Sequence, residues 1–318
     1  MSTGTASPQK PAEPAEPAEP AEPAEQGYRP PSDKPFLAGL VIISSVYVLL
    51  LVGLLVGDIA YIATGDLADT VELPGWLDWA RPALRPLLSM LATLGKPEIR
   101  YSVQLTMISC LFSAVLSLFV AVPTSYLLSR HNFPGKNLLD AILDIPIVLP
   151  PLVVGLSLLI LFQFVPDISF NGTVYSLRNA VVFQLPAVVL AQFMVAAAFA
   201  VRVMRATFDQ VDPRAEQVAL TLGCNQAQAF WRVVLPQCGN GMLTAGTLAW
   251  ARSLGEFGPL LIFAGATRMK TEVLSTTVFL ELSIGNLEGA VAVSLLMVVC
   301  AVVVLMLARV LGSRGLSL

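Results

Sequence analysis

The sequence predicts an all-α integral membrane protein with about six transmembrane helices. Of its 318 residues, 55% are hydrophobic and 13% are charged, whereas soluble domains average about 25% charged residues. The mean hydropathy of the chain is +0.73. Six segments carry the roughly 20 apolar residues that a bilayer crossing requires, and they are residues 36–57, 102–129, 142–164, 181–205, 242–264 and 288–311.

Residues 1–35 precede the first apolar segment and have low complexity. A Pro-Ala-Glu triplet repeats from Pro11 to Glu25. Proline at every third position blocks a helix, and the segment has no side chain large enough to build a core. We therefore expect a disordered cytoplasmic tail, partly polyproline-II in character. The features of a signal peptide are missing, since the apolar region comes too late.

Residues 58–100 form a long link after the first span. Trp76 and Trp79 lie in it near Arg81, Arg85 and three prolines, and charges interrupt its apolar residues. This pattern favours an amphipathic piece at the extracytoplasmic interface, with a short re-entrant segment as the alternative. The expected organisation is a tail (1–35), a first span with its link (36–100), a transmembrane core (101–311) and a C-terminal cytoplasmic tail (312–318).

Lysine and arginine positions predict the orientation of the chain. Basic residues flank the short loops of one side closely, among them Arg130, Lys136, Arg202 and Arg214. Cytoplasmic loops carry such an excess, so both termini are expected in the cytosol. The polar segment between the fourth and fifth spans then also lies in the cytosol.

Composition excludes several classes of site. The cysteines Cys110, Cys224, Cys238 and Cys300 are scattered without a CxxC pair, and His131 is the single histidine. Neither pattern is that of a metal site, and buried or reduced thiols are the simpler interpretation. The chain has no basic run or basic face, so nucleic acid is not an expected partner.

Two of the spans have internal features. The third opens with three prolines between Ile145 and Pro151, which remove backbone donors and bend or break a helix. A broken helix at membrane depth survives only inside protein or beside water, so Pro150 and Pro151 are expected near a pathway. The fourth span contains Ala196–Ala198, small residues that let helices approach closely.

The polar segment from Asp212 to Pro236 predicts a helix, a turn and a second helix. Asp212 followed by a proline is a favourable helix start, and Glu216 then falls in the first turn. Gly223 permits a sharp stop, and Pro236 is expected to end the second helix. Such an element can dock on a soluble partner, whereas a simple cytoplasmic hairpin is the plainer alternative. The candidate docking residues are Asp212, Glu216, Gln217, Ala219, Gly223, Val233, Leu235 and Pro236.

The fifth span contains two opposite charges. Arg252 and Glu256 are four residues apart and therefore share one helix face. Charges inside a span cost at least about 2.5–3.5 kcal/mol each unless they are paired or hydrated. They either line a polar path or lock two helices as an ion pair, and the two roles are compatible. The candidate pathway or gate residues are Pro150, Pro151, Arg252, Ser253, Gly255, Glu256 and Gly258.

The spacing from Glu216 to Pro236 resembles the cytoplasmic coupling loop of ABC importer permeases. The glycine, Gly223, and the Leu235-Pro236 pair fall in register, while the usual Glu-Ala-Ala triplet reads Gln217-Val218-Ala219 with the acid one residue earlier. Three further runs resemble the oxyanion branch of these permeases, which covers molybdate, tungstate and sulfate importers. They are Phe133–Lys136, Leu149–Gly155 and Ser253–Gly258. The run Met269–Val273 is closer to the sulfate type.

The resemblance implies a type I ABC importer permease in the plasma membrane, with molybdate as the favoured anion and sulfate or thiosulfate as the alternative. Its implied partners are cytoplasmic ATPase subunits, a second permease subunit and an extracytoplasmic anion-binding protein. ATP and Mg²⁺ would be bound by the ATPase, because this chain has no phosphate-binding Gly-x-x-x-x-Gly-Lys-Ser/Thr loop. It is therefore expected to be no enzyme by itself and to bind no cofactor. The rivals are an ion-gradient-driven secondary transporter and a membrane scaffold without transport.

Overall fold

The structure is a computed structural model that describes residues 34–65, 67–71, 79–166, 168–170 and 173–314. The Pro-Ala-Glu repeat, Trp76 and residues 315–318 of the expected C-terminal tail lie outside the described residues. The chain divides into two units, Met1–Leu51 and Val52–Leu318, and each is described by itself. Within the described residues the protein is nearly all helical, as predicted.

The first unit contains the beginning of helix α1 (Lys34–Thr64). The described side chains between Leu40 and Leu51 are exposed and almost all apolar, as suits a helix surrounded by lipid. Helix α1 ends at Thr64 and not at residue 57 as predicted, because the single charge at Asp58 does not interrupt it.

The described part of the link after α1 includes two short helices. They are the 3₁₀ turn η1 (Leu67–Thr70) and the 15-residue helix α2 (Arg81–Gly95), which is too short to cross a bilayer. Arg85 Nη1 donates to the carbonyl of Ala63 at 3.1 Å and ties α2 to the end of α1. Leu88 and Ser89 are the buried side of α2. A helical piece was expected here, and its interfacial placement stays a prediction.

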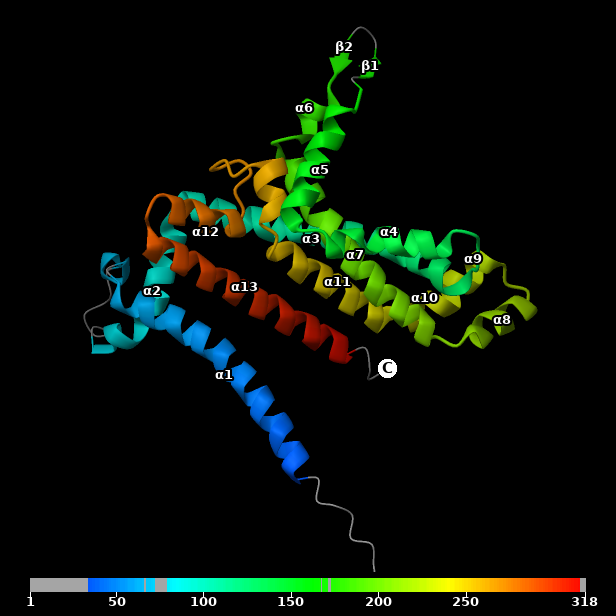
Figure 1. The fold of residues 1–318 in the computed structure, drawn as a ribbon, viewed down its shortest axis with the longest axis horizontal. Coiled ribbons are helices and arrows are strands. Elements are labelled where there is room, and N and C mark those ends of the chain that lie inside the picture. The colour runs from blue at the N-terminus through cyan, green and yellow to red at the C-terminus, as the bar shows by residue number, and fades with distance from the viewer. Residues whose placement is uncertain (1–33, 66, 72–78, 167, 171–172, 315–318) are drawn as a thin grey trace, which may run out of the picture. The chain divides into compact units, whose positions relative to one another are not determined.

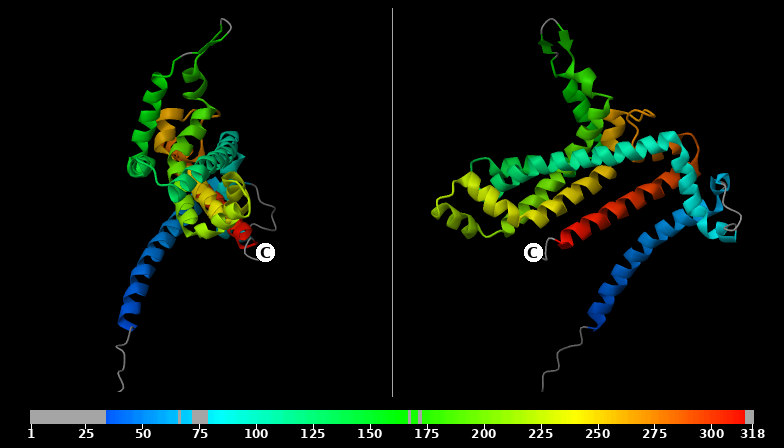
Figure 2. Two further views of the ribbon diagram at one scale, coloured as in Figure 1. Left: turned by 90° about the vertical axis from the view of Figure 1, so that its right-hand side faces the viewer. Right: turned by 180° about the vertical axis from the view of Figure 1, so that it is seen from behind.

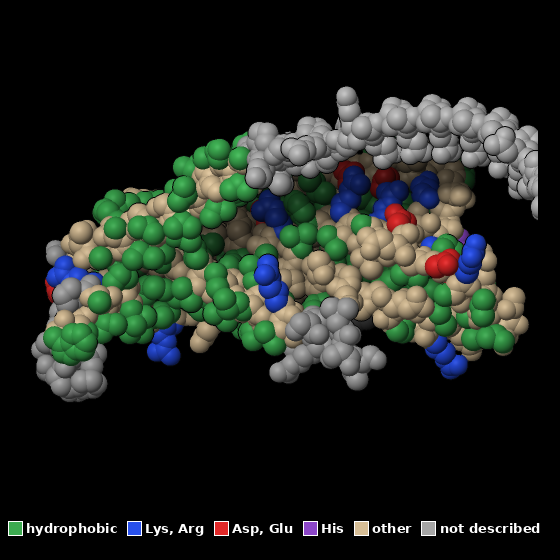
Figure 3. All heavy atoms as spheres, turned by 90° about the horizontal axis from the view of Figure 1, so that it is seen from below, with side chains coloured by type: hydrophobic (Ala, Val, Ile, Leu, Met, Phe, Trp, Pro, Cys, Tyr) green, Lys and Arg blue, Asp and Glu red, His purple; other side chains and the backbone are tan. Residues whose placement is uncertain are grey.

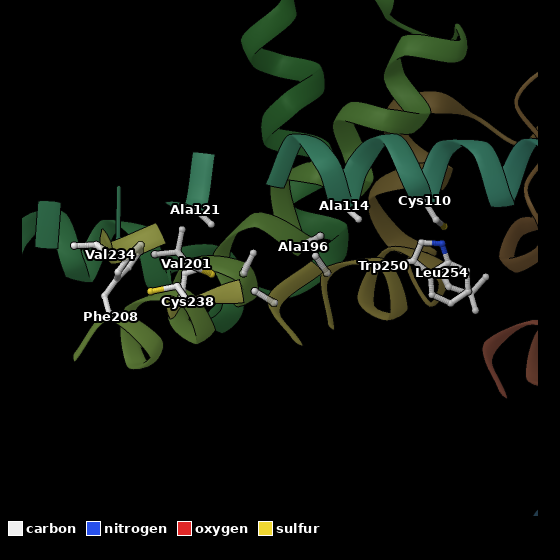
Figure 4. Packing of buried hydrophobic residues seen from close by; sticks show 14 residues of the cluster. Cys110, Ala114, Ala121, Ala196, Val201, Phe208, Val234, Cys238, Trp250 and Leu254 are labelled. Carbon is white, nitrogen blue, oxygen red and sulfur yellow. The ribbon is translucent and has the colours of Figure 1, made fainter. Parts of the chain in front are cut away.

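The core of the second unit lies between α3 (Pro97–Arg130), α7 (Leu185–Gln210) and α11 (Gly239–Leu254). Figure 4 shows its small and large side chains interleaved, with Ala114, Ala121 and Ala196 between the larger Phe208 and Trp250. Small residues along α3 and α7 let the two backbones approach closely. Serines of α3 reinforce this contact, since Ser113 and Ser125 donate to α7 carbonyls at 3.0 and 2.9 Å. The predicted internal contact at Ala196–Ala198 is confirmed, with Ala196 and Ala198 buried.

The third predicted span is broken, as its prolines indicated. Helices α4 (Lys136–Val148) and α5 (Pro151–Gln163) meet at an angle of 112° across Leu149 and Pro150. Figures 1 and 2 show α4 running along α7 while α5 turns away from it. After α5 come the two-stranded hairpin β1 (Ile168–Phe170) and β2 (Thr173–Tyr175) and the short helix α6 (Leu177–Val181).

The fifth predicted span, 242–264, is not one continuous helix. Helix α11 ends at Leu254, and a π-helical turn η4 (Leu260–Ala264) follows the interruption. Gly255, Gly258 and Pro259 supply the break, because glycine is flexible and proline has no backbone donor. Helix α12 (Leu274–Ser283) and the long helix α13 (Leu287–Arg314) complete the chain.

Fewer continuous helices than the six predicted segments have the length and composition of a membrane span. In the part of the chain that the structure describes, four helices are long and apolar enough to cross a membrane, and the bent pair α4–α5 would make a fifth. The four are α1, α3, α7 and α13. The difference arises because hydropathy counts apolar residues and does not register the breaks that glycine and proline introduce at 255–259.

Candidate functional site

The connection between α7 and α11 forms the predicted helix–turn–helix at one end of the helix group (Figure 1). Helix α8 (Pro213–Thr221) begins at Asp212, whose side chain accepts a 2.9 Å hydrogen bond from the backbone of Arg214. Gly223 has φ +92°, a conformation that side chains with a Cβ rarely adopt. Helix α9 (Gln226–Ala229) then starts with a capping box between Asn225 and Gln228. We call residues 212–237 the coupling segment.

The prediction that Pro236 ends the second helix is wrong. Helix α9 continues into a π-helical turn η3 (Phe230–Val234), then α10 (Leu235–Gln237) and, through Cys238, α11. A π turn holds an extra residue and shifts the ladder of backbone hydrogen bonds. Pro236 lies in the first turn after this shift, where its missing donor does least harm.

Glu216 faces the interior of the protein. Its Oε1 accepts a 2.5 Å hydrogen bond from the hydroxyl of Tyr126, and its Oε2 lies 3.6 Å from Nε of Arg130. Arg130 also donates to the carbonyl of Val211 at 2.8 Å. The first turn of α8 is thereby fastened to the last turn of α3. Sequence reasoning missed Tyr126 and Arg130 because they lie about 90 positions away along the chain.

The outward side of the coupling segment is more apolar than the prediction suggested. Leu222 is 80% exposed and Trp231 66% exposed, and Val218 is also exposed. Of the predicted residues, Gln217 and Pro236 are exposed, Val233 and Leu235 are half-buried, and Ala219 is buried. Exposed apolar side chains beside a polar loop are a sign of a protein contact. The signal in the sequence was the presence of large apolar residues in an otherwise polar stretch.

The two interrupted helices meet at their breaks. A Cβ atom on Gly155 of α5 would lie 2.6 Å from the Cα of Pro259, and one on Gly258 would lie 2.9 Å from the backbone nitrogen of Leu152. Such separations leave room only for glycine. The structure therefore brings the predicted residues Pro150, Pro151 and Gly258 into one region. Pro150 and Pro151 are exposed there, whereas Gly258 is buried.

Arg252 and Glu256 form the predicted pair. Arg252 Nη2 lies 2.8 Å from Glu256 Oε1, although α11 ends between the two residues. The Glu256 side chain is 1% exposed, and that of Arg252 is 31% exposed. The guanidinium of Arg252 lies 5.5 Å above the ring of Phe199 on α7, a cation–π arrangement. The backbone oxygen of Glu256 accepts from Ser275 Oγ at 2.6 Å, which joins the break to α12.

The other two predicted residues hold the backbone of this break. Ser253 is buried, and its hydroxyl donates to the carbonyl of Ala249 one turn earlier. Gly255 is exposed and caps the end of α11, with its amide bonded to the carbonyl of Ser253. Both residues shape the exit from α11.

A second buried charged cluster was missed. Arg268 bridges Glu98 of α3 at 2.6 Å and Glu281 of α12 at 3.0 Å. Asn286 donates to the other oxygen of Glu281 at 2.6 Å. Glu272 is fully buried nearby. The loop before α12 folds back onto α3, and no local sequence pattern predicts that contact.

Burial raises the pKa of the Glu272 carboxyl above its ordinary value, and Arg268 opposes this only in part. Because this pKa is raised, the Glu272 carboxyl in the folded protein keeps its proton at pH values where the unfolded chain has lost it. The stabilising contribution is present below the unfolded pKa of about 4.3 and is lost as pH rises through the folded pKa. Each pH unit in that window removes up to about 1.4 kcal/mol of unfolding free energy.

We therefore expect the melting temperature of the detergent-solubilised protein to fall between pH 5 and pH 8 relative to Glu272→Gln, which cannot lose a proton. The measurement is thermal unfolding of both proteins across this range. Glu98 and Glu281 also face the cluster and raise the pKa of Glu272, so Glu98→Gln should move the fall in melting temperature to lower pH. Parallel pH profiles for the wild type and Glu272→Gln would contradict the assignment of the proton to Glu272.

The class of protein follows from three features of the fold. They are long apolar helices, two broken helices that meet, and a capped helical segment between α7 and α11, and together they indicate a multi-pass membrane permease. Residues 113–315 match the family described as "Binding-protein-dependent transport system inner membrane component", and the chain belongs to this family. Its members are permease subunits of ABC transporters, so the chain is an inner-membrane transport subunit without an ATPase site of its own. Membership also removes the secondary transporter and the scaffold as alternatives.

Relatives in the same family transport oxyanions, according to their names. The sulfate transport system permease protein CysT of Salmonella typhimurium is 29% identical over 225 residues, which cover 69% of this chain and 78% of the relative. CysW of Synechocystis sp., another sulfate permease, is 30% identical over 225 residues, covering 70% and 79%. The molybdate/tungstate permease WtpB of Pyrococcus abyssi is 32% identical over 175 residues, covering 55% and 64%.

Solved structures confirm the fold. A bacterial alginate ABC transporter, solved with an alginate pentasaccharide-bound periplasmic protein, superposes with a TM-score of 0.64 over 89% of this chain and 95% of the other, at 14% identity. The inward-facing MetNI methionine ABC transporter gives a TM-score of 0.52 over 68% and 94%, at 17% identity. At these identities the likeness concerns the fold alone, and it confirms the predicted type I ABC importer permease architecture.

Proposed function

We propose that this permease carries a tetrahedral oxyanion into the cell. The observation that carries the proposal is the similarity to sulfate and molybdate/tungstate permeases across most of the transmembrane core. The runs Leu149–Gly155 and Ser253–Gly258 favour molybdate, and sulfate or thiosulfate is the alternative. Both runs lie at the place where the broken helices meet, which supports a role in the pathway.

The partners in this proposal are two cytoplasmic ATPase subunits, a second permease subunit and an extracytoplasmic anion-binding protein. The ATPase subunits bind ATP and Mg²⁺, and this chain binds neither. They dock on the exposed apolar side of the coupling segment, which includes Leu222 and Trp231. Both termini lie in the cytosol, and the second permease subunit is a copy of this chain.

The mechanism is alternating access. ATP binding draws the two coupling segments of the assembly together, and each state is stabilised by its own set of contacts. Two connections support the transmission of this movement. Glu216 fastens the segment to α3 through Tyr126 and Arg130, and the helical backbone runs on through Cys238 into α11. Helix α11 leads directly to the Arg252–Glu256 pair and the break that follows it.

Purification of the complex and uptake into vesicles test the proposal. The permease, the ATPase and the binding protein are reconstituted together, and ATP-dependent uptake of radiolabelled molybdate and sulfate is measured with each anion competing against the other. Strong competition by one anion assigns the substrate. Uptake of neither anion by an assembled complex that hydrolyses ATP would refute the oxyanion proposal.

Gly223→Val is expected to uncouple the complex. Left-handed backbone costs a residue with a Cβ about 1–2 kcal/mol, and a β-branched residue more, although the space around Gly223 is open. The turn between α8 and α9 should therefore shift and the docking surface should deform. We expect stimulation of ATP hydrolysis by the loaded binding protein to fall severalfold, while membrane insertion stays normal.

Gly223→Asn is the matched control, because asparagine tolerates the left-handed conformation better than other residues. It should retain most of the stimulation. Equal and full stimulation in both variants would show that the geometry of this turn does not matter for coupling.

A further inference from the structure

Two ion pairs connect helix α4 to α7. Helix α4 has no buried residue, although most of its side chains are apolar. Two acids one turn apart, Asp140 and Asp144, pair with Arg205 and Arg202 of α7. Arg202 engages Asp144 through two nitrogens, with Nε at 2.6 Å from Oδ1. Leu143 is half-buried and packs against the main core, so this one apolar contact and the two ion pairs together hold α4 in place.

These two arginines continue a line that begins at Arg252. The Arg252 guanidinium lies over Phe199, and Phe199, Arg202 and Arg205 follow one another at intervals of three residues along α7. Residues at this interval are neighbours on a helix surface, and six residues rise about 9 Å. The three guanidinium groups therefore follow one another along α7, between the break after α11 and the end of α7 that leads to the coupling segment.

Each guanidinium in this line is both paired and accessible. The side chains of Arg252, Arg202 and Arg205 are 31%, 50% and 26% exposed, and their partners are Glu256, Asp144 and Asp140. Arg205 also lies 4.0 Å from Asp209 on its own helix. Figure 3 shows a group of basic and acidic side chains on one part of this face, with further charged side chains near its ends and edges. A purely structural ion pair between helices has no need of such access.

The chemistry of the pairs suits an oxyanion. A guanidinium is always charged and presents parallel donors that bind two oxygens at once, as carboxylates and phosphates do. An edge of a tetrahedral oxyanion offers the same two oxygens as a carboxylate. An incoming anion can therefore take the place of Asp144 on Arg202, and the carboxylate can return when the anion leaves. The carboxylates keep the line close to neutral, so the anion is passed on and not trapped, as conduction requires.

We propose that Arg252, Arg202 and Arg205 form a relay that passes the transported oxyanion along α7, each arginine exchanging its carboxylate partner for the anion. The inference rests on the proposed function. It also gives α4 a role, because release of Asp140 and Asp144 frees a helix that has no buried side chain. The break at Leu149 and Pro150 is the point about which α4 can then move.

The relay predicts opposite effects for the two partners of one pair. Arg202→Gln removes a site for the anion and should lower the rate of uptake at least tenfold. Asp144→Asn leaves Arg202 charged and unpaired, so the anion should be held more tightly. The solubilised complex should then be protected against heat by lower concentrations of sulfate or molybdate than the wild type, while its maximal uptake rate falls. Arg309→Gln, a change at an exposed arginine of α13, is the control and should leave uptake unchanged.

If the pairs serve only to hold α4, both single changes should weaken stability alike and neither should alter protection by the anion. That result, with normal wild-type uptake, would overturn the relay. The double variant Arg202→Gln/Asp144→Asn removes both charges and tests the relay where a single variant assembles poorly. For this double variant the relay predicts normal ATPase stimulation with lost uptake, and recovered uptake would refute the relay. Absence of oxyanion uptake by the wild-type complex would instead refute the proposed function.

Discussion

Gly155→Ala is expected to abolish uptake and to prevent stable assembly of the permease. The new Cβ would lie 2.6 Å from the Cα of Pro259 and 3.0 Å from its carbonyl oxygen. These are backbone atoms, so no side chain can rotate away, and the two breaks must separate. Overpacking of this kind typically costs about 1–3 kcal/mol, and a backbone clash falls at the upper end or above. Gly258→Ala, which meets the backbone of Leu152, should act in the same way.

Gly239→Ala is the matched control, because a Cβ on Gly239 would have no neighbour within 4 Å. Alanine at the start of α11 should be neutral or slightly stabilising, since alanine favours helices over glycine by up to about 1 kcal/mol. The measurements are the amount of complex that copurifies with the ATPase, its melting temperature and uptake in vesicles. Normal assembly and uptake in Gly155→Ala would show that the close contact of the two breaks is not required.

Arg252→Ala and Glu256→Ala are each expected to lower the unfolding free energy by about 3–5 kcal/mol, because removal of one partner leaves the other buried or partly buried without its counter-charge. The penalty should be larger in Arg252→Ala, since Glu256 is the more deeply buried partner. The double variant should recover much of the loss, because replacement of both partners is far milder than breaking the pair from one side.

A double-mutant cycle on thermal stability, run beside vesicle uptake, separates the two roles of this pair. A purely structural ion pair predicts that the double variant regains both stability and uptake. A pathway role predicts that stability returns while uptake stays low, because the polar lining has been removed. Additive single effects, with coupling below about 0.5 kcal/mol, would mean that the two residues do not depend on one another.

Local signals in the sequence predicted much of the site. The proline at 213 after Asp212, the glycine at 223 and the four-residue spacing of Arg252 and Glu256 each depend on neighbours within one or two helical turns. Such interactions are decided by short-range geometry, so they can be inferred from residue type and spacing. The broken helix at Pro150 belongs to the same class.

Contacts between distant segments could not be predicted in this way. Arg202 and Asp144 are separated by 58 positions and Tyr126 and Glu216 by 90, and no local pattern marks them as partners. The burial of Glu272 depends on a loop folding onto α3. The prediction that Pro236 ends the second helix failed for a related reason. A proline normally ends a helix, but it can follow a π turn without ending the helix.

The π turn η3 lies ahead of helix α11, with α10 and Cys238 between them. In an ordinary α-helix each residue rotates the chain by about 100° about the axis. A π turn holds one surplus residue, so η3 helps to set the rotation at which the chain enters α11. Loss or gain of a single residue at η3 would rotate the whole helix and carry Trp250 out of the core and Arg252 away from α7. Related chains that differ in length by one residue here should therefore differ in which side of this helix faces the transported ion.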